Sequence, residues 1–378
     1  MKKIGCLFLA FIYLLPLNMV KANDLAVNAS SVIVMEPTTG EIIYERNSHE
    51  RRHPASMTKI MTMLLVMEAI EDGIIKWDDM VTASENASSM GGSQILLETG
   101  EQMSVEDMFK GLAVASGNDA AVALAEKIAG TEAMFVDMMN KRAQELGLQD
   151  TNFKNPHGLD EANHYSSAYD MAIMAKELVK HEKVFEFTSI YEDYLRKGTD
   201  KAFWLVNTNK LVRFYNGVDG LKTGYTSEAG FCITATAKIN DMRIITVVMG
   251  EPDSKTRNAD VTSVFDYVYS QYALTNVVDK NTILDTVNVE KGKKDTVEII
   301  AKETVTDLYK KTDGANEITY DIQVDKIKAP VKNGDVVGKL TLKENGIATK
   351  TIDLTVKEDV EKANIFELYI KYLKEYLG

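Results

Sequence analysis

Apolar residues recur with two different periods along the first 275 residues. Strand-like runs lie at both ends of this region, and runs with helical spacing lie between them. A hairpin is predicted where runs 31–36 and 41–45 flank a Pro-Thr-Thr-Gly turn. We expect helices at 53–70, 105–115, 119–128, 131–146, 168–181 and 261–274, and further strands at 220–226, 230–239 and 242–250. This order predicts one α+β domain, a sheet with a helical insertion.

From about residue 276 the pattern becomes purely β. Short runs rich in Val, Ile and Thr recur between Lys, Gly and Asp turns, at 285–289, 296–300, 318–324, 336–342 and 350–356. They predict a small all-β sandwich. The last stretch, 365–377, has one broad apolar helical face and several tyrosines, which favours an amphipathic helix lying in a membrane interface. Docking on the β domain and self-association are the alternatives.

The N-terminus has the features of a secretory signal. Lys2 and Lys3 precede a mostly apolar run at 6–17, and a small residue follows at Ala22. We therefore expect four segments: a signal peptide at 1–22, a catalytic domain at 23–275, a β-sandwich at 276–358 and the amphipathic helix at 359–378. The signal predicts export to the bacterial envelope. Because the C-terminal helix is expected to lie in the membrane interface, we expect peripheral attachment to the outer face of the cytoplasmic membrane.

Charge and cysteine content narrow the possible partners. The formal net charge of −13 argues against nucleic acid as a partner. After signal removal Cys232 is the only cysteine, so the mature chain can form no internal disulfide, which fits a bacterial envelope. Cys232 lies in an apolar strand-like run, and we expect a core residue rather than a reactive thiol. The histidines show no metal-ligand spacing, and no cofactor is expected.

The predicted helix at 53–70 carries the first candidate chemistry. Pro54 can open this helix and Gly73 can end it. Beyond Lys59 the helix is apolar almost all round, so it should be buried. Ser56 and Lys59 are three residues apart and share one face, and a buried lysine with a lowered pKa can take the proton of a serine hydroxyl. Taken alone, the pair is more typical of a capping serine beside a solvated lysine.

Two further motifs change that interpretation. Ser116-Gly117-Asn118 lies between two predicted helices, and Lys222-Thr223-Gly224 lies on a predicted strand. Another Ser-x-Asn at 84–86 has no clear helix boundary, and we treat it as coincidental. Together and in this order, the three motifs resemble those of the penicillin-interacting serine enzymes.

Longer stretches narrow the resemblance. The sequences at 115–121, 155–159 and 219–226 resemble the low-molecular-mass penicillin-binding proteins, the serine-type D-alanyl-D-alanine carboxypeptidases. The resemblance covers the mature chain, including the β domain and the terminal helix. It implies a β-lactamase/transpeptidase-like catalytic fold. It also implies removal of the terminal D-alanine from peptidoglycan stem pentapeptides during cell-wall maturation, with β-lactam antibiotics as covalent inhibitors.

The resemblance also implies the catalytic residues. Ser56 would attack the carbonyl between the two D-alanines, and Lys59 would accept its proton. Ser116 would relay a proton to the leaving D-alanine, and Asn118 would hold either the peptide or Lys59. The backbone N–H groups of Ser56 and Tyr225 would form the oxyanion hole.

Substrate binding is assigned on the same basis. Lys222 and Thr223 would bind the terminal carboxylate, and a side chain at Gly224 would obstruct the site. Tyr225 stands where some family members carry His. Arg257 matches a family arginine near the carboxylate pocket, and a solvated surface arginine is an equally good interpretation. His157 is expected to be loop structure rather than catalytic.

Two alternatives remain. A class A-like β-lactamase shares the fold and similar motifs but needs a glutamate that activates water, and Glu161 lacks the expected surrounding sequence. A non-hydrolytic penicillin-binding sensor or wall-binding protein is the other alternative. A protein of this kind would be recognised by the loss of Lys59 or Lys222, and both lysines are present in this sequence.

Overall fold

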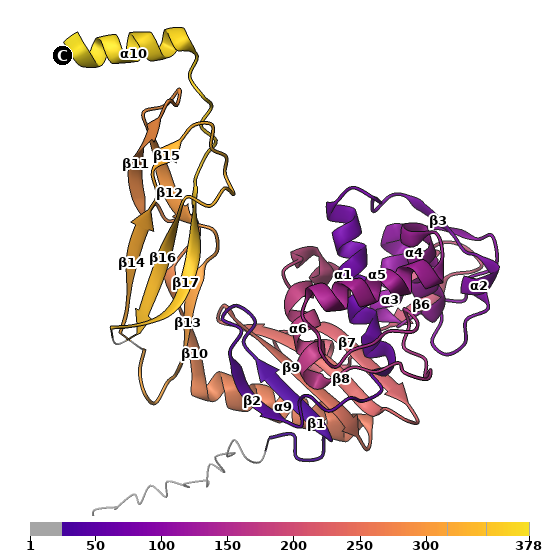
Figure 1. Cartoon of the computed structure of the whole chain (residues 1–378). Helices are drawn as coiled ribbons and strands as arrows, with labels where there is room; N and C mark the ends of the chain where they lie inside the picture. The colour runs from indigo at the N-terminus through magenta and orange to yellow at the C-terminus, as the bar shows by residue number, and fades with distance from the viewer. Residues whose placement is uncertain (1–24, 316, 345, 378) are drawn as a thin grey trace, which may run out of the picture.

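The computed structural model describes residues 25–377 apart from 316 and 345, so the predicted signal peptide at 1–22 lies outside the described residues. Figure 1 shows a broad mixed α/β body, a β column beside it, and a helix at the far end of the column. The α+β domain, the β domain and the C-terminal helix expected from the sequence are therefore all present, in the expected order along the chain.

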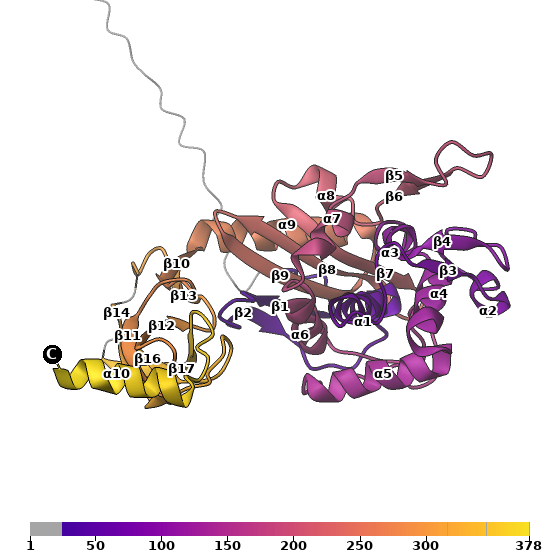
Figure 2. The same cartoon turned by 90° about the horizontal axis from the view of Figure 1, so that it is seen from above.

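An antiparallel five-stranded sheet forms the floor of the α/β body. Its strand order is β2-β1-β9-β8-β7, with bounds Ser31–Met35 for β1, Ile42–Arg46 for β2, Val218–Thr226 for β7, Gly230–Ile239 for β8 and Met242–Glu251 for β9. All five residues of β1 are buried. Val32 and Val34 pack with α9 (Ser254–Gln271), whereas Ile33 and Met35 pack with the other helices. The two-residue period of the strand thus covers both faces of the sheet, as Figure 2 shows.

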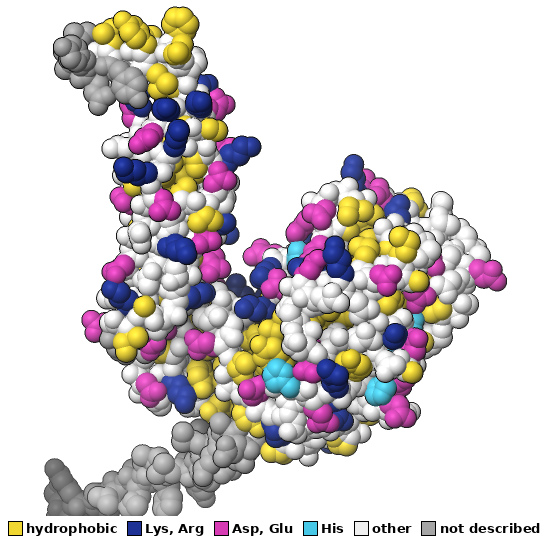
Figure 3. All heavy atoms as spheres, viewed as in Figure 1, with side chains coloured by type: hydrophobic (Ala, Val, Ile, Leu, Met, Phe, Trp, Pro, Cys, Tyr) yellow, Lys and Arg dark blue, Asp and Glu magenta, His cyan; other side chains and the backbone are white. Residues whose placement is uncertain are grey.

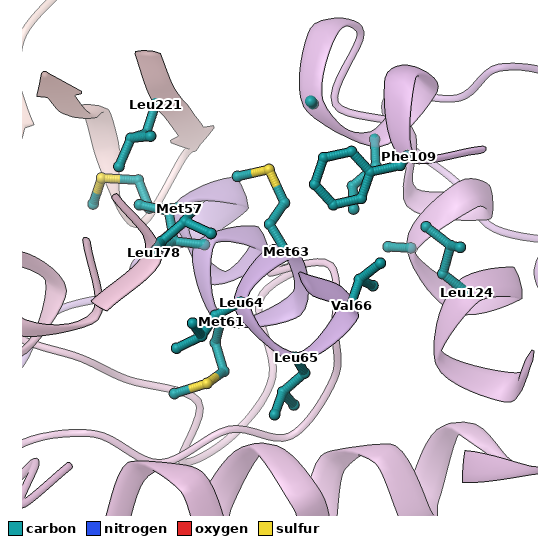
Figure 4. Close-up of a cluster of buried hydrophobic side chains, with 14 of the residues drawn as sticks. Met57, Met61, Met63, Leu64, Leu65, Val66, Phe109, Leu124, Leu178 and Leu221 are labelled. Atoms are coloured by element: carbon teal, nitrogen blue, oxygen red, sulfur yellow. The ribbon is translucent and has the colours of Figure 1, made fainter. Parts of the chain in front are cut away.

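The helical insertion is built around α1 (Lys59–Glu71), which follows a 3₁₀ turn, η2 (Ala55–Thr58). Its main neighbours are α3 (Val105–Val114), α4 (Asn118–Ala129), α5 (Glu132–Glu145) and α6 (Ala168–Leu178). In Figure 4, side chains leave α1 in several directions toward Phe109, Leu124 and Leu178. This confirms that α1 is a buried helix, and its packing holds the first turn in place.

Shorter elements connect these helices. They are β3 (Met80–Thr82), α2 (Glu85–Ser88), β4 (Gln102–Ser104), η3 (Glu182–Val184), α7 (Phe185–Thr188), β5 (Glu192–Leu195), β6 (Phe203–Val206) and α8 (Leu211–Phe214). The expectation of no helix boundary near residue 84 was wrong, because Ser84 caps α2 by accepting the Ala87 N–H at 2.9 Å.

The helix expected at 261–274 is α9 (Ser254–Gln271), which begins seven residues earlier than expected and ends three residues earlier. α9 begins at Ser254 because the Asp253 carboxylate accepts the Thr256 N–H at 2.7 Å, an N-cap that the apolar spacing does not reveal. It ends at Gln271, and the chain continues directly as strand β10 (Tyr272–Val278). This strand crosses the expected domain boundary at 275.

The β column is a two-sheet sandwich. A six-stranded sheet has the order β14-β16-β17-β12-β11-β15, and β10 pairs with β13 in a second sheet. The bounds are Asp285–Glu290 (β11), Thr296–Ala301 (β12), Val305–Lys310 (β13), Ile318–Val324 (β14), Ile327–Lys328 (β15), Gly338–Glu344 (β16) and Ile347–Val356 (β17). Val278 and Val305 from the small sheet join the apolar core of the large one.

The chain ends in α10 (Ile365–Leu377), as the sequence predicts. Its described apolar side chains are largely exposed, with Ile365 at 79% and Phe366 at 76%, and they form the apolar tip of the column in Figure 3. Among the described residues, no helix has the length and apolar character needed to cross a membrane.

Candidate active site

Ser56 and Lys59 meet at the start of the buried helix. Ser56 lies in η2, and Lys59 is the first residue of α1. The Lys59 Nζ lies 3.0 Å from the Ser56 Oγ, 2.6 Å from the Asn118 Oδ1 and 2.6 Å from the carbonyl oxygen of His157. Lys59 is fully buried. The amine is therefore fixed by three oxygen neighbours, one of which is the candidate nucleophile.

The surroundings favour the neutral form of this amine. Burial lowers the pKa of Lys59 well below its usual value, and the positive charge of Lys222 lowers the pKa further. The carboxylate of Asp119 acts in the opposite direction. A neutral amine beside a serine hydroxyl can accept the proton of that hydroxyl.

The turn between α3 and α4 supplies the second motif. Ser116 has a φ of +65°, a left-handed conformation that is costly for a residue with a side chain. Its hydroxyl is buried, and no described residue forms a hydrogen bond with it. Asn118 opens α4 and donates from Nδ2 to the Gly91 carbonyl at 2.7 Å, which orients its Oδ1 toward Lys59. The turn thus presents one anchored amide and one uncommitted hydroxyl.

Strand β7 brings the third motif against η2. A Cβ on Gly224 would lie 2.8 Å from the Pro54 carbonyl oxygen, so only glycine permits this approach. Lys222 is buried, and its burial together with the charge of Arg257 lowers its pKa to about 7. The Thr223 hydroxyl donates to the Thr208 hydroxyl at 2.8 Å.

Tyr225, at the end of this strand, is 57% exposed, and its ring packs on Phe231 with centroids 4.3 Å apart.

Arg257 is not a solvated surface arginine. It lies in the first turns of α9, is buried, and donates to the Cys232 carbonyl at 3.4 Å and to the Asn258 Oδ1 at 2.9 Å. Its charge reaches Lys222, whose pKa it lowers. Cys232 itself is buried, and burial raises the pKa of its thiol to about 11, which confirms a core residue.

The loop at 155–159 contributes a group that the sequence interpretation missed. His157 lies in a loop, as expected, but its backbone carbonyl accepts from Lys59. The Asn155 Oδ1 holds this loop by accepting the N–H groups of His157 (3.3 Å) and Gly158 (2.7 Å). The His157 ring is buried and its pKa is lowered to about 3, so the ring stays neutral. The Asn-Pro-His-Gly sequence signals such a turn but not what its carbonyl contacts.

Glu161 follows in the same region. It is exposed, and its carboxylate lies 3.4 Å from the Asn155 Nδ2. No group of three or more potential metal-ligating side chains occurs among the described residues.

Comparison with known proteins identifies both parts of the chain. Residues 18–253 match the Peptidase S11 family, D-alanyl-D-alanine carboxypeptidase, and residues 272–362 match the C-terminal domain of penicillin-binding protein 5. D-alanyl-D-alanine carboxypeptidase DacF of Bacillus subtilis is 52% identical over 359 residues, which cover 95% of this chain and 91% of that protein.

Solved structures agree. Penicillin-binding protein 5 of Haemophilus influenzae is 33% identical with a TM-score of 0.71, over 89% of this chain and 98% of that one. Penicillin-binding protein D2 of Listeria monocytogenes, solved in its ampicillin-bound form, is 30% identical with a TM-score of 0.58, over 64% of this chain and 98% of that one. The chain therefore belongs to the D-alanyl-D-alanine carboxypeptidase family of serine peptidases, Peptidase S11.

Proposed function

We propose that this chain is a penicillin-sensitive serine carboxypeptidase that removes the terminal D-alanine of peptidoglycan stem peptides through a Ser56 acyl-enzyme. The observation that carries the residue assignment is the fully buried Lys59 amine, 3.0 Å from the Ser56 hydroxyl. Family membership supports the reaction and the substrate class.

Acylation begins when the Ser56 Oγ attacks the carbonyl carbon between the two D-alanines and its proton passes to the Lys59 amine. Backbone N–H groups of Ser56 and Tyr225 stabilise the oxyanion. The C–N bond then breaks as the proton taken up by Lys59 passes through the Ser116 hydroxyl to the leaving D-alanine amine. The buried, unpartnered state of that hydroxyl supports a role that requires a free donor. Water then hydrolyses the ester and Ser56 recovers its proton.

Lys222 and Thr223 bind the carboxylate of the terminal D-alanine in this proposal. Arg257 adds positive charge from behind the sheet, where its effect on the pKa of Lys222 supports an electrostatic role. Asn118 acts mainly on Lys59, as the 2.6 Å contact suggests. Gly224 keeps β7 close to η2.

β-Lactams are expected to acylate the same serine. The ampicillin-bound form of the Listeria protein supports this extension to the present chain. An acyl-enzyme formed by penicillin keeps its leaving group tethered, so hydrolysis is slow and the enzyme stays blocked.

We also propose that the protein is exported after removal of 1–22 and attaches to the outer face of the cytoplasmic membrane through α10. The exposed apolar side chains of α10 support this attachment. The β-sandwich, assigned to 276–358, then holds the catalytic domain, assigned to 23–275, away from the lipid surface. Figure 1 places α10 at the end of the column farthest from the α/β body.

The test is D-alanine release from an N-acylated peptide ending in D-Ala-D-Ala, with Ser56→Ala as the inactive variant. We expect release by the mature protein, inhibition by penicillin, and loss of both release and covalent penicillin labelling in Ser56→Ala. Removing a nucleophile of this kind costs roughly 10⁶-fold in rate. Penicillin labelling of Ser56→Ala would show that another residue is the nucleophile.

A further inference from the structure

The recess between the α/β body and the β column is strongly basic. It forms a cleft of about 740 Å³ lined by residues of both parts of the chain. Seven of the lining side chains are Lys or Arg and three are Asp or Glu, although the chain as a whole carries a net charge of −13. Blue side chains are visible in this corner in Figure 3. Positive charge is therefore concentrated at one place on an acidic protein.

Ion pairs within the cleft use up all of its acidic groups. Lys180 pairs with Glu177 at 2.7 Å, Lys238 with Asp241 at 3.7 Å, and Lys350 with Glu303 at 3.4 Å. Arg243 pairs with Asp219, outside the lining, at 2.8 Å.

Three lysines remain without an ion pair among the described residues: Lys176 on α6, Lys280 after β10 and Lys302 after β12. They come from both parts of the chain. Lys280 and Lys302 also line an adjoining pocket of about 240 Å³ that continues along the β column. The lysines without an ion pair therefore line two pockets that share Lys280 and Lys302.

We propose that this cleft binds a linear polymer of phosphodiester-linked units. Lysine ammonium groups bind phosphates as point charges, and the Thr38 and Thr304 side chains in the lining add hydroxyl groups. The cleft of about 740 Å³ has room for several linked units, so a single phosphate would fill only a small part of it. A lipid surface cannot enter a concave recess, and α10 lies at the opposite end of the column.

The lining also argues against nucleic acid as the polymer. None of the residues lining the cleft is aromatic, whereas binding of single-stranded nucleic acid relies on bases stacked on aromatic side chains. A flexible polyanion without bases fits the cleft better. Binding would hold the enzyme on such a polymer, independently of the chemistry at Ser56.

The test is a titration of the whole mature protein with poly(glycerol phosphate) at several salt concentrations. The variant carries Lys176→Gln, Lys280→Gln and Lys302→Gln. The control carries Lys127→Gln, Lys326→Gln and Lys339→Gln, three exposed lysines outside the cleft that change the net charge equally. From counterion release on a single-stranded polyanion, loss of three contacts weakens binding about 100-fold at 0.1 M salt and reduces the salt slope by about 2. The control should bind like the unchanged protein.

Covalent penicillin labelling reports whether each variant is folded. If the triple variant is not labelled, the single variant Lys280→Gln replaces it in the titration. Loss of one contact should weaken binding of the polymer about fivefold. The proposal is overturned by equal losses in cleft and control variants, or by salt-independent binding. It is also overturned if poly-L-glutamate of equal charge binds as tightly, or if orthophosphate at the same total phosphate competes fully, which would indicate a simple ion site.

Discussion

In the proposed mechanism the chemistry depends on Lys59, because the charge state of its amine decides whether Ser56 can be activated. The positive charge of Lys222 lowers the pKa of Lys59, and the positive charge of Arg257 lowers the pKa of Lys222. A bound carboxylate at Lys222 would offset part of this positive charge. Substrate binding and the basicity of Lys59 are therefore coupled through charge.

Replacing Lys59 with arginine tests the role of a neutral base. Arginine stays protonated at any accessible pH, so Lys59→Arg should replace the neutral base with a permanent cation. We expect penicillin acylation to fall by roughly 10²- to 10⁴-fold, the usual contribution of a general base. In the unchanged protein, acylation should fall as pH decreases through the lowered pKa of Lys59, because protonation removes the base. Stopped-flow acylation rates measure both, with exposed Lys127→Arg as the control. Rapid acylation by Lys59→Arg would exclude this role.

The side chains of the candidate site were easier to predict from the sequence than its backbone groups or the burial of its residues. Ser56 and Lys59 were singled out by residue type and helical spacing, and Asn118 by its motif and the family resemblance; in the structure the Lys59 amine contacts both of the other side chains. The carbonyl of His157 could not be found this way, because every residue has a carbonyl and its direction depends on the fold. The burial of Arg257 was equally hidden, since it depends on where α9 begins.

At the scale of elements, the site depends on how closely the 155–159 loop packs on η2. Gly158 has a φ of +89°, and a Cβ there would lie 1.9 Å from the Ala55 carbonyl oxygen. The loop must therefore move if Gly158 gains a side chain. The His157 carbonyl, an acceptor for Lys59, would move with it.

Gly158→Ala should accordingly damage both stability and acylation. Gly147→Ala is the matched control, because Gly147 has a φ of +73° and open space around its Cβ position. Left-handed backbone alone costs about 1–2 kcal/mol, and the clash at Gly158 adds to that. Thermal unfolding and acylation rates should show a larger loss of stability for Gly158→Ala and slower acylation for that variant only. Equal effects of the two substitutions would mean that loop packing is irrelevant to the site.

Most long elements were predictable from the period of the apolar residues, and the strands that were missed in the β column share a cause. β13 and β15 were not predicted, and β10 was partly assigned to a helix. These strands depend on hydrogen-bonded partners elsewhere in the sequence: β10 pairs with β13 from Tyr272–Lys310 to Val278–Val305, and β15 pairs with β11. Such long-range partners cannot be read from a local window.

At the scale of the whole molecule, α10 presents its described apolar side chains to solvent at the end of the β column. Lys371 of this helix forms an ion pair with Asp295 of the column. Truncation should begin after Ala363, because Val360 pairs with Val331 and is buried in the sandwich. Side-chain replacement avoids that damage.

The triple variant Ile365→Ser, Phe366→Ser and Tyr369→Ser should therefore release the protein from lipid without affecting catalysis. Burying each such side chain in an apolar environment is worth roughly 1.5–3 kcal/mol, and only part of this is realised at an interface. A loss of at least about tenfold in vesicle binding is expected, since 1.4 kcal/mol is a factor of ten. Cosedimentation with phosphatidylglycerol vesicles measures it, and penicillin labelling should be unchanged.

Matched substitutions separate this effect from a general loss of apolar surface. Ile74→Ser, Phe214→Ser and Tyr320→Ser remove the same exposed side-chain types far from α10 in the sequence, and this protein should still sediment with vesicles. If both triple variants sediment equally well, the helix does not bind lipid. If the α10 variant instead loses a dimer seen by light scattering while vesicle binding persists, the apolar face serves self-association. The column would then join two copies of the enzyme rather than one copy and a membrane.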